Sequence, residues 1–182
     1  READAMAGLF DAIATSPKPV VARVHGAALG GGGGLVAACD IPLAAEGTVF
    51  GFTEVRLGLV PAVISPYVIG RIGESAAREL FLTGERFDAE KALMIGLVRA
   101  VVPERGLDAA VDGRVQQLLQ AGPRAVAEAK EAHHGANLAA VAAEVARHHH
   151  MAGSLVRALE LYRTAAATCR PTTGTTTSRP TT

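Results

Sequence analysis

The chain has 182 residues, of which 49 % are hydrophobic and 20 % are charged, as in a single globular domain with a buried core. Its 18 Lys and Arg residues balance its 18 Asp and Glu residues, and only 4 % of the residues are aromatic. The balanced charge and the scarcity of aromatic rings argue against nucleic acid or an anionic membrane surface as a partner.

The apolar runs and the cysteines indicate the compartment. No apolar run approaches the roughly 18 residues that span a bilayer, and the charged residues 1–4 lack a signal-peptide core. Cys39 and Cys169 are too few for a disulfide framework or a zinc cluster. We therefore expect a reducing, cytoplasmic compartment, no membrane contact and no metal site.

The first third of the chain alternates between helix and strand signals. Met6, Leu9, Phe10 and Ile13 follow helical spacing, and Pro17 cannot continue that helix. Apolar and β-branched runs predict strands at Val20–Val24, Ile41–Ala45 and Val49–Gly51, and a helix at Leu35–Cys39. A loop is expected between the first strand and the helix. This order is an α/β pattern with crossover connections.

The middle of the chain predicts a series of short helices. Asp88 is placed to cap the N-terminus of one of them, and Gly84 and Gly96 are placed to end two others. The expected helices are Pro66–Ile72, Glu74–Leu82, a segment from Asp88 to Gly96, Leu107–Gln120 and Arg124–Ala132, with a strand at Leu97–Val102.

Five consecutive glycines, Gly30–Gly34, precede the first predicted crossover helix. Glycine lets the backbone approach a ligand closely, and a helix start leaves N–H groups unpaired. The run therefore favours a backbone site for an anion or oxyanion, the alternative being a flexible loop. No Lys follows for a Walker loop, and no register fits the Gly-x-Gly-x-x-Gly of a dinucleotide loop, so both nucleotide motifs are excluded.

Glu54 is the second candidate site residue. It lies among apolar neighbours in the segment Phe50–Val55, a setting that suits a carboxylate to proton transfer. The residues alone leave open the alternative of a surface glutamate at the end of a strand.

Three ordered blocks of the sequence resemble the crotonase superfamily, the enoyl-CoA hydratases and isomerases. The blocks are Lys18–Gly32 with Ala38–Ile41, Phe50–Pro61, and Leu82–Val98 with Val101–Pro103. The resemblance covers residues 1 to about 132 and implies a spiral of ββα turns that assembles as a homotrimer or hexamer.

The resemblance also implies the site. In this family two backbone N–H groups hold the thioester oxygen of an acyl-CoA substrate as the enolate forms. Gly31 corresponds to one donor, and Ala28, Gly30 and Pro61 correspond to substrate-binding positions. The other donor belongs to a family segment upstream of residue 1 of this chain. Because the substrate carries CoA, no separate cofactor is implied.

One acid of the family is missing from this chain. Family hydratases usually hold a water between two glutamates, of which one corresponds to Glu54 and the other to Gly34, three residues after Gly31. We expect hydration of an α,β-unsaturated acyl-CoA by a single glutamate. The alternatives are an isomerase of the same fold and a catalytically inactive binder of CoA thioesters.

The runs Glu54–Val68 and Gly34–Ala37 narrow the resemblance to a bacterial branch named methylglutaconyl-CoA hydratase. That branch belongs to leucine degradation, within the wider fatty acid metabolism of acyl-CoA thioesters.

The C-terminal third departs from the family pattern. Leu138–Ala166 is rich in alanine and permits a helix, whereas no apolar residue follows Pro171. We expect a crotonase-like core at 1–132 without the family's N-terminal part, a helical segment at 133–166, and a disordered Thr- and Pro-rich tail at 167–182.

Several polar residues of the core receive structural roles. Asp40 is expected to anchor a helix–strand junction, and Cys39 is expected to pack in the core. The adjacent histidines at 133–134 and 148–150 lack acidic or cysteine partners at ligand spacing, which favours a solvated face over a metal site.

Overall fold

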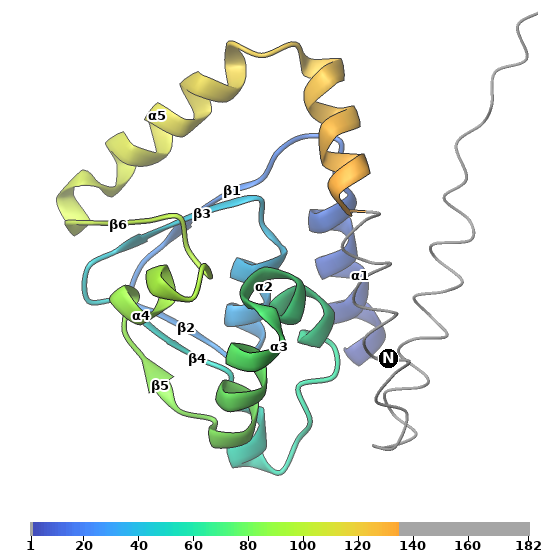
Figure 1. Ribbon diagram of the computed structural model, residues 1–182, viewed down its shortest axis with the longest axis vertical. Helices are drawn as coiled ribbons and strands as arrows, with labels where there is room; N and C mark the ends of the chain where they lie inside the picture. Colours follow the sequence, from blue (N-terminus) through green and yellow to red (C-terminus); the bar gives the residue numbers. More distant parts are fainter. Residues whose placement is uncertain (1, 135–182) are drawn as a thin grey trace, which may run out of the picture. The chain divides into compact units, whose positions relative to one another are not determined.

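The computed structural model describes residues 2–134, and their strands form two small sheets (Figure 1). In the first sheet β3 (Ile41–Ala45) lies between β1 (Val21–Val24) and β6 (Ala100–Val102), and both pairings are parallel. In the second sheet β4 (Val49–Gly51) pairs in parallel with β2 (Ala27–Leu29) and antiparallel with β5 (Arg86–Phe87).

The chain gives one strand to each sheet in turn and then forms a helix. β1 and β2 are followed by α2 (Gly31–Ala38), and β3 and β4 are followed by the short helix η1 (Glu54–Leu57) and by α3 (Ser65–Thr83). This repeated strand–strand–helix order is the expected ββα spiral. It brings the ends of β2 and β4 side by side, because the two strands are parallel neighbours.

The remaining helices surround this spiral. They are α1 (Glu2–Thr15), α4 (Ala89–Met94), η2 (Glu104–Gly106), α5 (Leu107–Leu119) and a helix over residues 123–134. Helix α2 packs against both α1 and α3 (Figure 1), so it is the central helix of this part of the chain.

Aromatic side chains fill the core between the second sheet and α3. Phe50 and Phe52 have no exposed surface, and the Phe52 ring meets the Phe81 ring edge to face at 5.4 Å between centroids. Phe10 and Ala14 of α1 are buried and Ile13 is partly buried, whereas Met6 is 43 % and Leu9 50 % exposed, so α1 buries only part of its predicted apolar face. A second, smaller cluster of Leu43, Ala45 and Leu107 joins α5 to the first sheet.

The structure corrects several expected boundaries. The predicted loop before the glycines contains β2, and a strand at Arg86–Phe87 was not expected. The predicted strand Leu97–Val102 is only three residues long, at Ala100–Val102. The two helices expected at Pro66–Ile72 and Glu74–Leu82 are confirmed: they make up α3, and Gly73 between them has a non-helical backbone with φ 78° and ψ 164°.

The capping prediction for Asp88 is confirmed, since its Oδ1 accepts the Lys91 backbone N–H at 2.8 Å. Among residues 2–134 no helix combines the length and hydropathy needed to cross a membrane. The expectations for Leu138–Ala166, for the histidines at 148–150 and for the tail at 167–182 lie outside the described residues.

Candidate functional site

Helix α2 begins inside the glycine run, four residues earlier than the predicted start at Leu35. Gly30 precedes it with φ 52° and ψ −122°, a backbone conformation that side-chain-bearing residues rarely adopt. The Gly30 N–H donates to the Gly51 carbonyl at 2.8 Å, which ties the start of α2 to the end of β4.

No side chain caps the start of α2. The Gly34 N–H donates to the Gly30 carbonyl at 3.2 Å, so the N–H groups of Gly31, Gly32 and Gly33 come before this helical bond. These groups and the helix dipole favour negative charge at this end. The structure therefore places Gly31, the predicted oxyanion donor, in the first turn of a helix.

The Glu54 carboxylate lies directly against Gly30. A Cβ built on Gly30 would lie 3.4 Å from Oε1 and 4.0 Å from Oε2 of Glu54. The side chain is half-buried, and its buried Oε2 has no hydrogen-bond partner among residues 2–134. Glu54 is thus not a freely exposed surface glutamate, and it lies beside the residue that precedes Gly31.

Gly34, the position of the missing acid, has no room for a side chain. A Cβ at this position would lie 2.3 Å from Cγ2 and 2.9 Å from Cβ of Ile64, and 3.3 Å from Cζ of Phe10. Ile64 is 2 % exposed and Phe10 is 1 % exposed. With the chain packed in this way, a carboxylate at position 34 is sterically excluded.

Ala28 and Pro61 lie on the elements that flank the site. The Ala28 side chain is buried on β2, and the Pro61 ring is also buried. The Pro61 carbonyl accepts the Ser65 N–H at 3.0 Å and the Ser65 hydroxyl at 2.6 Å. Both side chains thus serve packing, and the substrate-binding roles of Ala28, Gly30 and Pro61 stay predictions.

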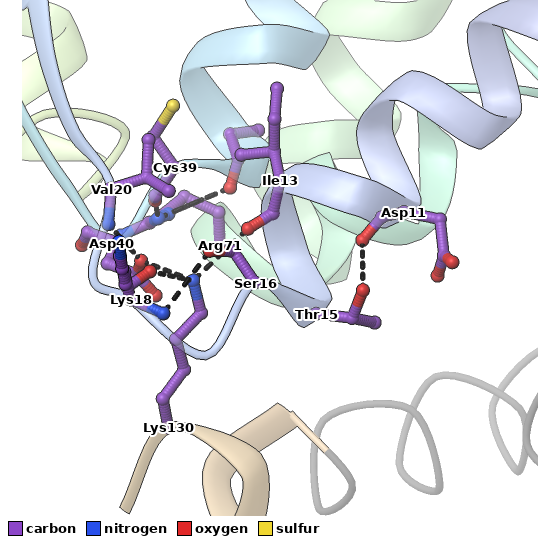
Figure 2. A network of polar contacts seen from close by, with 11 residues as sticks. Asp11, Ile13, Thr15, Ser16, Lys18, Val20, Cys39, Asp40, Arg71 and Lys130 are labelled. Carbon is purple, nitrogen blue, oxygen red and sulfur yellow. Dashed lines mark hydrogen bonds and ion pairs between the residues drawn. The ribbon is translucent and has the colours of Figure 1, made fainter. Parts of the chain in front are cut away.

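The opposite end of α2 is held by a polar network (Figure 2). The Arg71 guanidinium of α3 donates to the Ala37 carbonyl at 3.2 and 3.3 Å, to the Asp40 carbonyl at 3.2 Å, and to the Cys39 carbonyl. A cation at the C-terminus of a helix satisfies its last carbonyls and complements its dipole. Burial lowers the pKa of the Arg71 guanidinium, and Arg99 lowers it further.

Asp40 and Lys130 complete this network. The Asp40 Oδ2 accepts the Val20 N–H at 2.7 Å and pairs with the Lys130 ammonium at 2.7 Å. Lys130 extends from helix 123–134 (Figure 2) and also donates to the carbonyls of Ile13 and Lys18. The predicted anchoring role of Asp40 is confirmed, whereas nothing local in the sequence indicated Arg71 or Lys130 as partners.

Cys39 is a buried free cysteine, as expected, and burial raises the pKa of its thiol. Burial also lowers the pKa of His134, against the opposing charge of Asp11. Within residues 2–134, no three His, Cys, Asp or Glu side chains are gathered in a way that would hold a metal ion.

The sequence matches the family model of enoyl-CoA hydratase/isomerase over residues 3–162. The chain therefore belongs to the enoyl-CoA hydratase/isomerase family, the crotonase superfamily. The match extends beyond residue 132, where we expected the resemblance to stop.

Individual relatives agree with this assignment. A relative from Thermus thermophilus is 43 % identical over 95 residues, which make up 52 % of this chain and 38 % of that protein. The enoyl-CoA hydratase ACTT6 of Alternaria alternata is 36 % identical over 127 residues, which make up 69 % of this chain and 43 % of that protein. The chain thus spans about half or less of the length of these curated relatives.

Solved structures share the fold. An enoyl-CoA hydratase from Shewanella pealeana is 35 % identical with a TM-score of 0.69, covering 90 % of this chain and 64 % of that one. One from Mycobacterium avium subsp. paratuberculosis is 31 % identical with a TM-score of 0.73, covering 90 % and 69 %. The crotonase-like α/β fold is thereby confirmed.

Proposed function

We propose that this chain hydrates an α,β-unsaturated acyl-CoA thioester with Glu54 as its single acid/base. The observation that carries the proposal is the position of Glu54, whose buried Oε2 has no partner and lies beside the uncapped start of α2. A buried acceptor without a partner costs roughly 1–3 kcal/mol, so the group calls for a specific explanation, and a catalytic role is one that folded proteins show.

The proposed reaction divides the work between backbone and carboxylate. The Gly31 N–H donates to the thioester oxygen as negative charge develops there, and one such donor is typically worth about 3–4 kcal/mol of barrier. Glu54 takes a proton from water while the water oxygen bonds to C3 and the double-bond electrons move into the enolate. Glu54 then returns that proton to C2, which completes the addition of one water.

An isomerase is the second candidate, because only one carboxylate fits at the site and Gly34 has no space for another. In that reaction Glu54 removes a proton from C2 of a 3-enoyl-CoA and returns it at C4, with the same donor on the thioester oxygen. Both reactions use a substrate that carries its own CoA, with no separate cofactor.

The finer assignments belong to the same proposal. We propose methylglutaconyl-CoA as the substrate, on the resemblance of the runs Glu54–Val68 and Gly34–Ala37. We also propose a homotrimer or hexamer as the assembly, on the resemblance to the family, and the cytoplasm as the compartment, on the small number of cysteines. The substrate is tested by comparing kcat/KM among thioesters, and the assembly by measuring the mass in solution.

The first test is turnover of the purified full chain with crotonyl-CoA, 3-methylglutaconyl-CoA and 3-hexenoyl-CoA. Loss of the conjugated double bond with addition of water supports the hydratase, and conversion of the 3-enoyl to the 2-enoyl thioester supports the isomerase. Tight binding of all three without any product overturns both and leaves the inactive thioester binder.

A further inference from the structure

The segment from Phe52 to Ile64 contacts the glycine run at three positions. The Glu54 carboxylate lies against Gly30, which precedes α2, the Phe52 ring lies against Gly33 and the Ile64 side chain lies against Gly34. Glu54 thus lies in a segment that has one apolar contact with α2 before it in the chain and one after it.

Neither apolar contact leaves room for a side chain at the glycine of α2 that it meets. A Cβ on Gly33 would lie 2.8 Å from Cε1 of Phe52, and a Cβ on Gly34 would lie 2.3 Å from Cγ2 of Ile64. Phe52 is completely buried and Ile64 nearly so. Gly32, in the same turn, has nothing within 4 Å of its own Cβ position, so the close packing is confined to one face of the helix.

The helix that carries Glu54 buries no residue of its own. All four residues of η1 are at least partly exposed, and η1 otherwise approaches Gly84 at the end of α3 through Val55 and Arg56. The buried anchors of this segment on α2 are therefore the side chains before and after η1.

We propose that Phe52 and Ile64 are positioning residues for Glu54. Each fills a notch that a glycine leaves on α2, and together they fix the distance between the Glu54 carboxylate and the first turn of that helix. This inference rests on the proposed function for its effect on turnover, but the placement it describes is a property of the chain itself. A misplacement of about 1 Å costs on the order of 10²-fold in rate.

The test compares Gly34→Ala, which fills a notch, and Ile64→Ala, which empties it, with Gly113→Ala as the matched control. Gly113 is a helical glycine of α5, outside the candidate site, and has nothing within 4 Å of its Cβ position. Turnover is normalised to folded protein. We expect kcat to fall by about 10²-fold in the first two variants with KM nearly unchanged, and the control to keep the kcat of the parent. A purely structural role would lower the yield of folded protein and leave kcat as it was.

A rescue variant keeps the test valid if Gly34→Ala folds poorly. Gly34→Ala/Ile64→Ala removes Cγ2, the closest atom, and leaves the two Cβ atoms to adjust around 2.9 Å. We expect this double variant to recover stability and kcat relative to Gly34→Ala. If it is as impaired as the sum of its two single changes, the two residues act independently of each other and the proposal is wrong.

A second readout works even if the chain turns over no thioester. Carbodiimide coupling of an amine to Glu54, located by mass spectrometry, reports access to a carboxylate whose Oε2 is buried. We expect faster labelling in Ile64→Ala and Gly34→Ala than in the parent, and no change in Gly113→Ala. Equal labelling in all four proteins overturns the positioning role. An inactive parent with this labelling pattern overturns only the proposed function.

Discussion

The two ends of α2 are built in opposite ways. At its C-terminus Arg71 covers the last carbonyls, and Asp40 and Lys130 are paired at 2.7 Å. At its N-terminus no side chain caps the helix, and the adjacent Glu54 carboxylate keeps a buried oxygen without a partner. At the C-terminal end polar side chains satisfy the hydrogen bonds of the helix. The N-terminal end is lined by glycine and apolar side chains, which leave its hydrogen-bonding groups unsatisfied.

This difference separates anchoring from chemistry. The charged groups at its C-terminus hold α2 without using the N–H groups of its first turn. Its first turn is then free to present N–H groups to a ligand. The polar network therefore serves stability, whereas the unsatisfied end serves the proposed reaction, and the two functions should be separable by mutation.

The largest effect is expected at the unsatisfied end. Glu54→Gln keeps the shape of the side chain but removes its ability to accept a proton, so turnover should fall by at least about 10²-fold. The thermal unfolding midpoint should stay close to that of the parent. Glu46→Gln, which makes the same charge change at an exposed position, is the control. Equal turnover in both variants would show that Glu54 is not the acid/base.

The next effect is expected at the satisfied end. Lys130→Met leaves the Asp40 carboxylate without its cation, and the free energy of unfolding should fall by about 2 kcal/mol, as for a hydrogen bond to a charged group. Arg124→Met, on the same helix, breaks a pair with Glu128 that is largely exposed and should change little.

Urea unfolding gives both free energies, and kcat per folded molecule should match the parent in both variants. If Lys130→Met lowered kcat while keeping its stability, the two ends of α2 would not be separable.

A smaller effect is expected at α4, whose start is capped where that of α2 is not. Asp88→Ala removes the acceptor of the Lys91 N–H, which should cost about 1 kcal/mol of unfolding free energy. Asp88→Asn keeps an acceptor oxygen and should cost much less. Urea unfolding of the two variants makes the comparison, and an equal loss would show that charge, rather than the cap itself, stabilises α4.

The smallest effect concerns pH and helix 123–134. Burial lowers the pKa of His134 from its ordinary value of 6.5, although Asp11 and Asp40 oppose this. Below that pH the unfolded chain takes up a proton more readily than the folded chain, so stability is lost as pH falls. His134→Gln should therefore lose less stability than the parent between about pH 8 and about pH 5. Thermal unfolding of both proteins across this pH range makes the comparison. An equal fall of the unfolding midpoint in the two proteins would contradict the prediction.

The sequence predicted well those elements whose signals are local. Pro17 ends α1, Asp88 caps α4, and the apolar run at Ile41–Ala45 forms the central strand β3. The family and the fold also followed from contiguous blocks of residues. The strands β2 and β5 were missed because each is only two or three residues long and exists through its pairing with β4.

The sequence indicated the residues of the proposed site but not the side chains that pack around them. The glycine run and Glu54 indicated their chemistry by residue type, and the structure places them side by side. The contacts of Gly33 with Phe52 and of Gly34 with Ile64 join residues that are 19 and 30 positions apart. Such pairs leave no local pattern in the sequence, because the residues around a glycine do not show whether it makes room for a distant side chain or lies in a loop.

The contact between Gly34 and Ile64 also constrains how a second acid can be acquired. A glutamate at position 34 would drive its side chain into Ile64, since even a Cβ there would lie 2.3 Å from Cγ2. A smaller residue at position 64 makes room for that acid, but the positioning role proposed above predicts that this change alone lowers turnover. A designer who adds a second acid to this scaffold must therefore change positions 34 and 64 together.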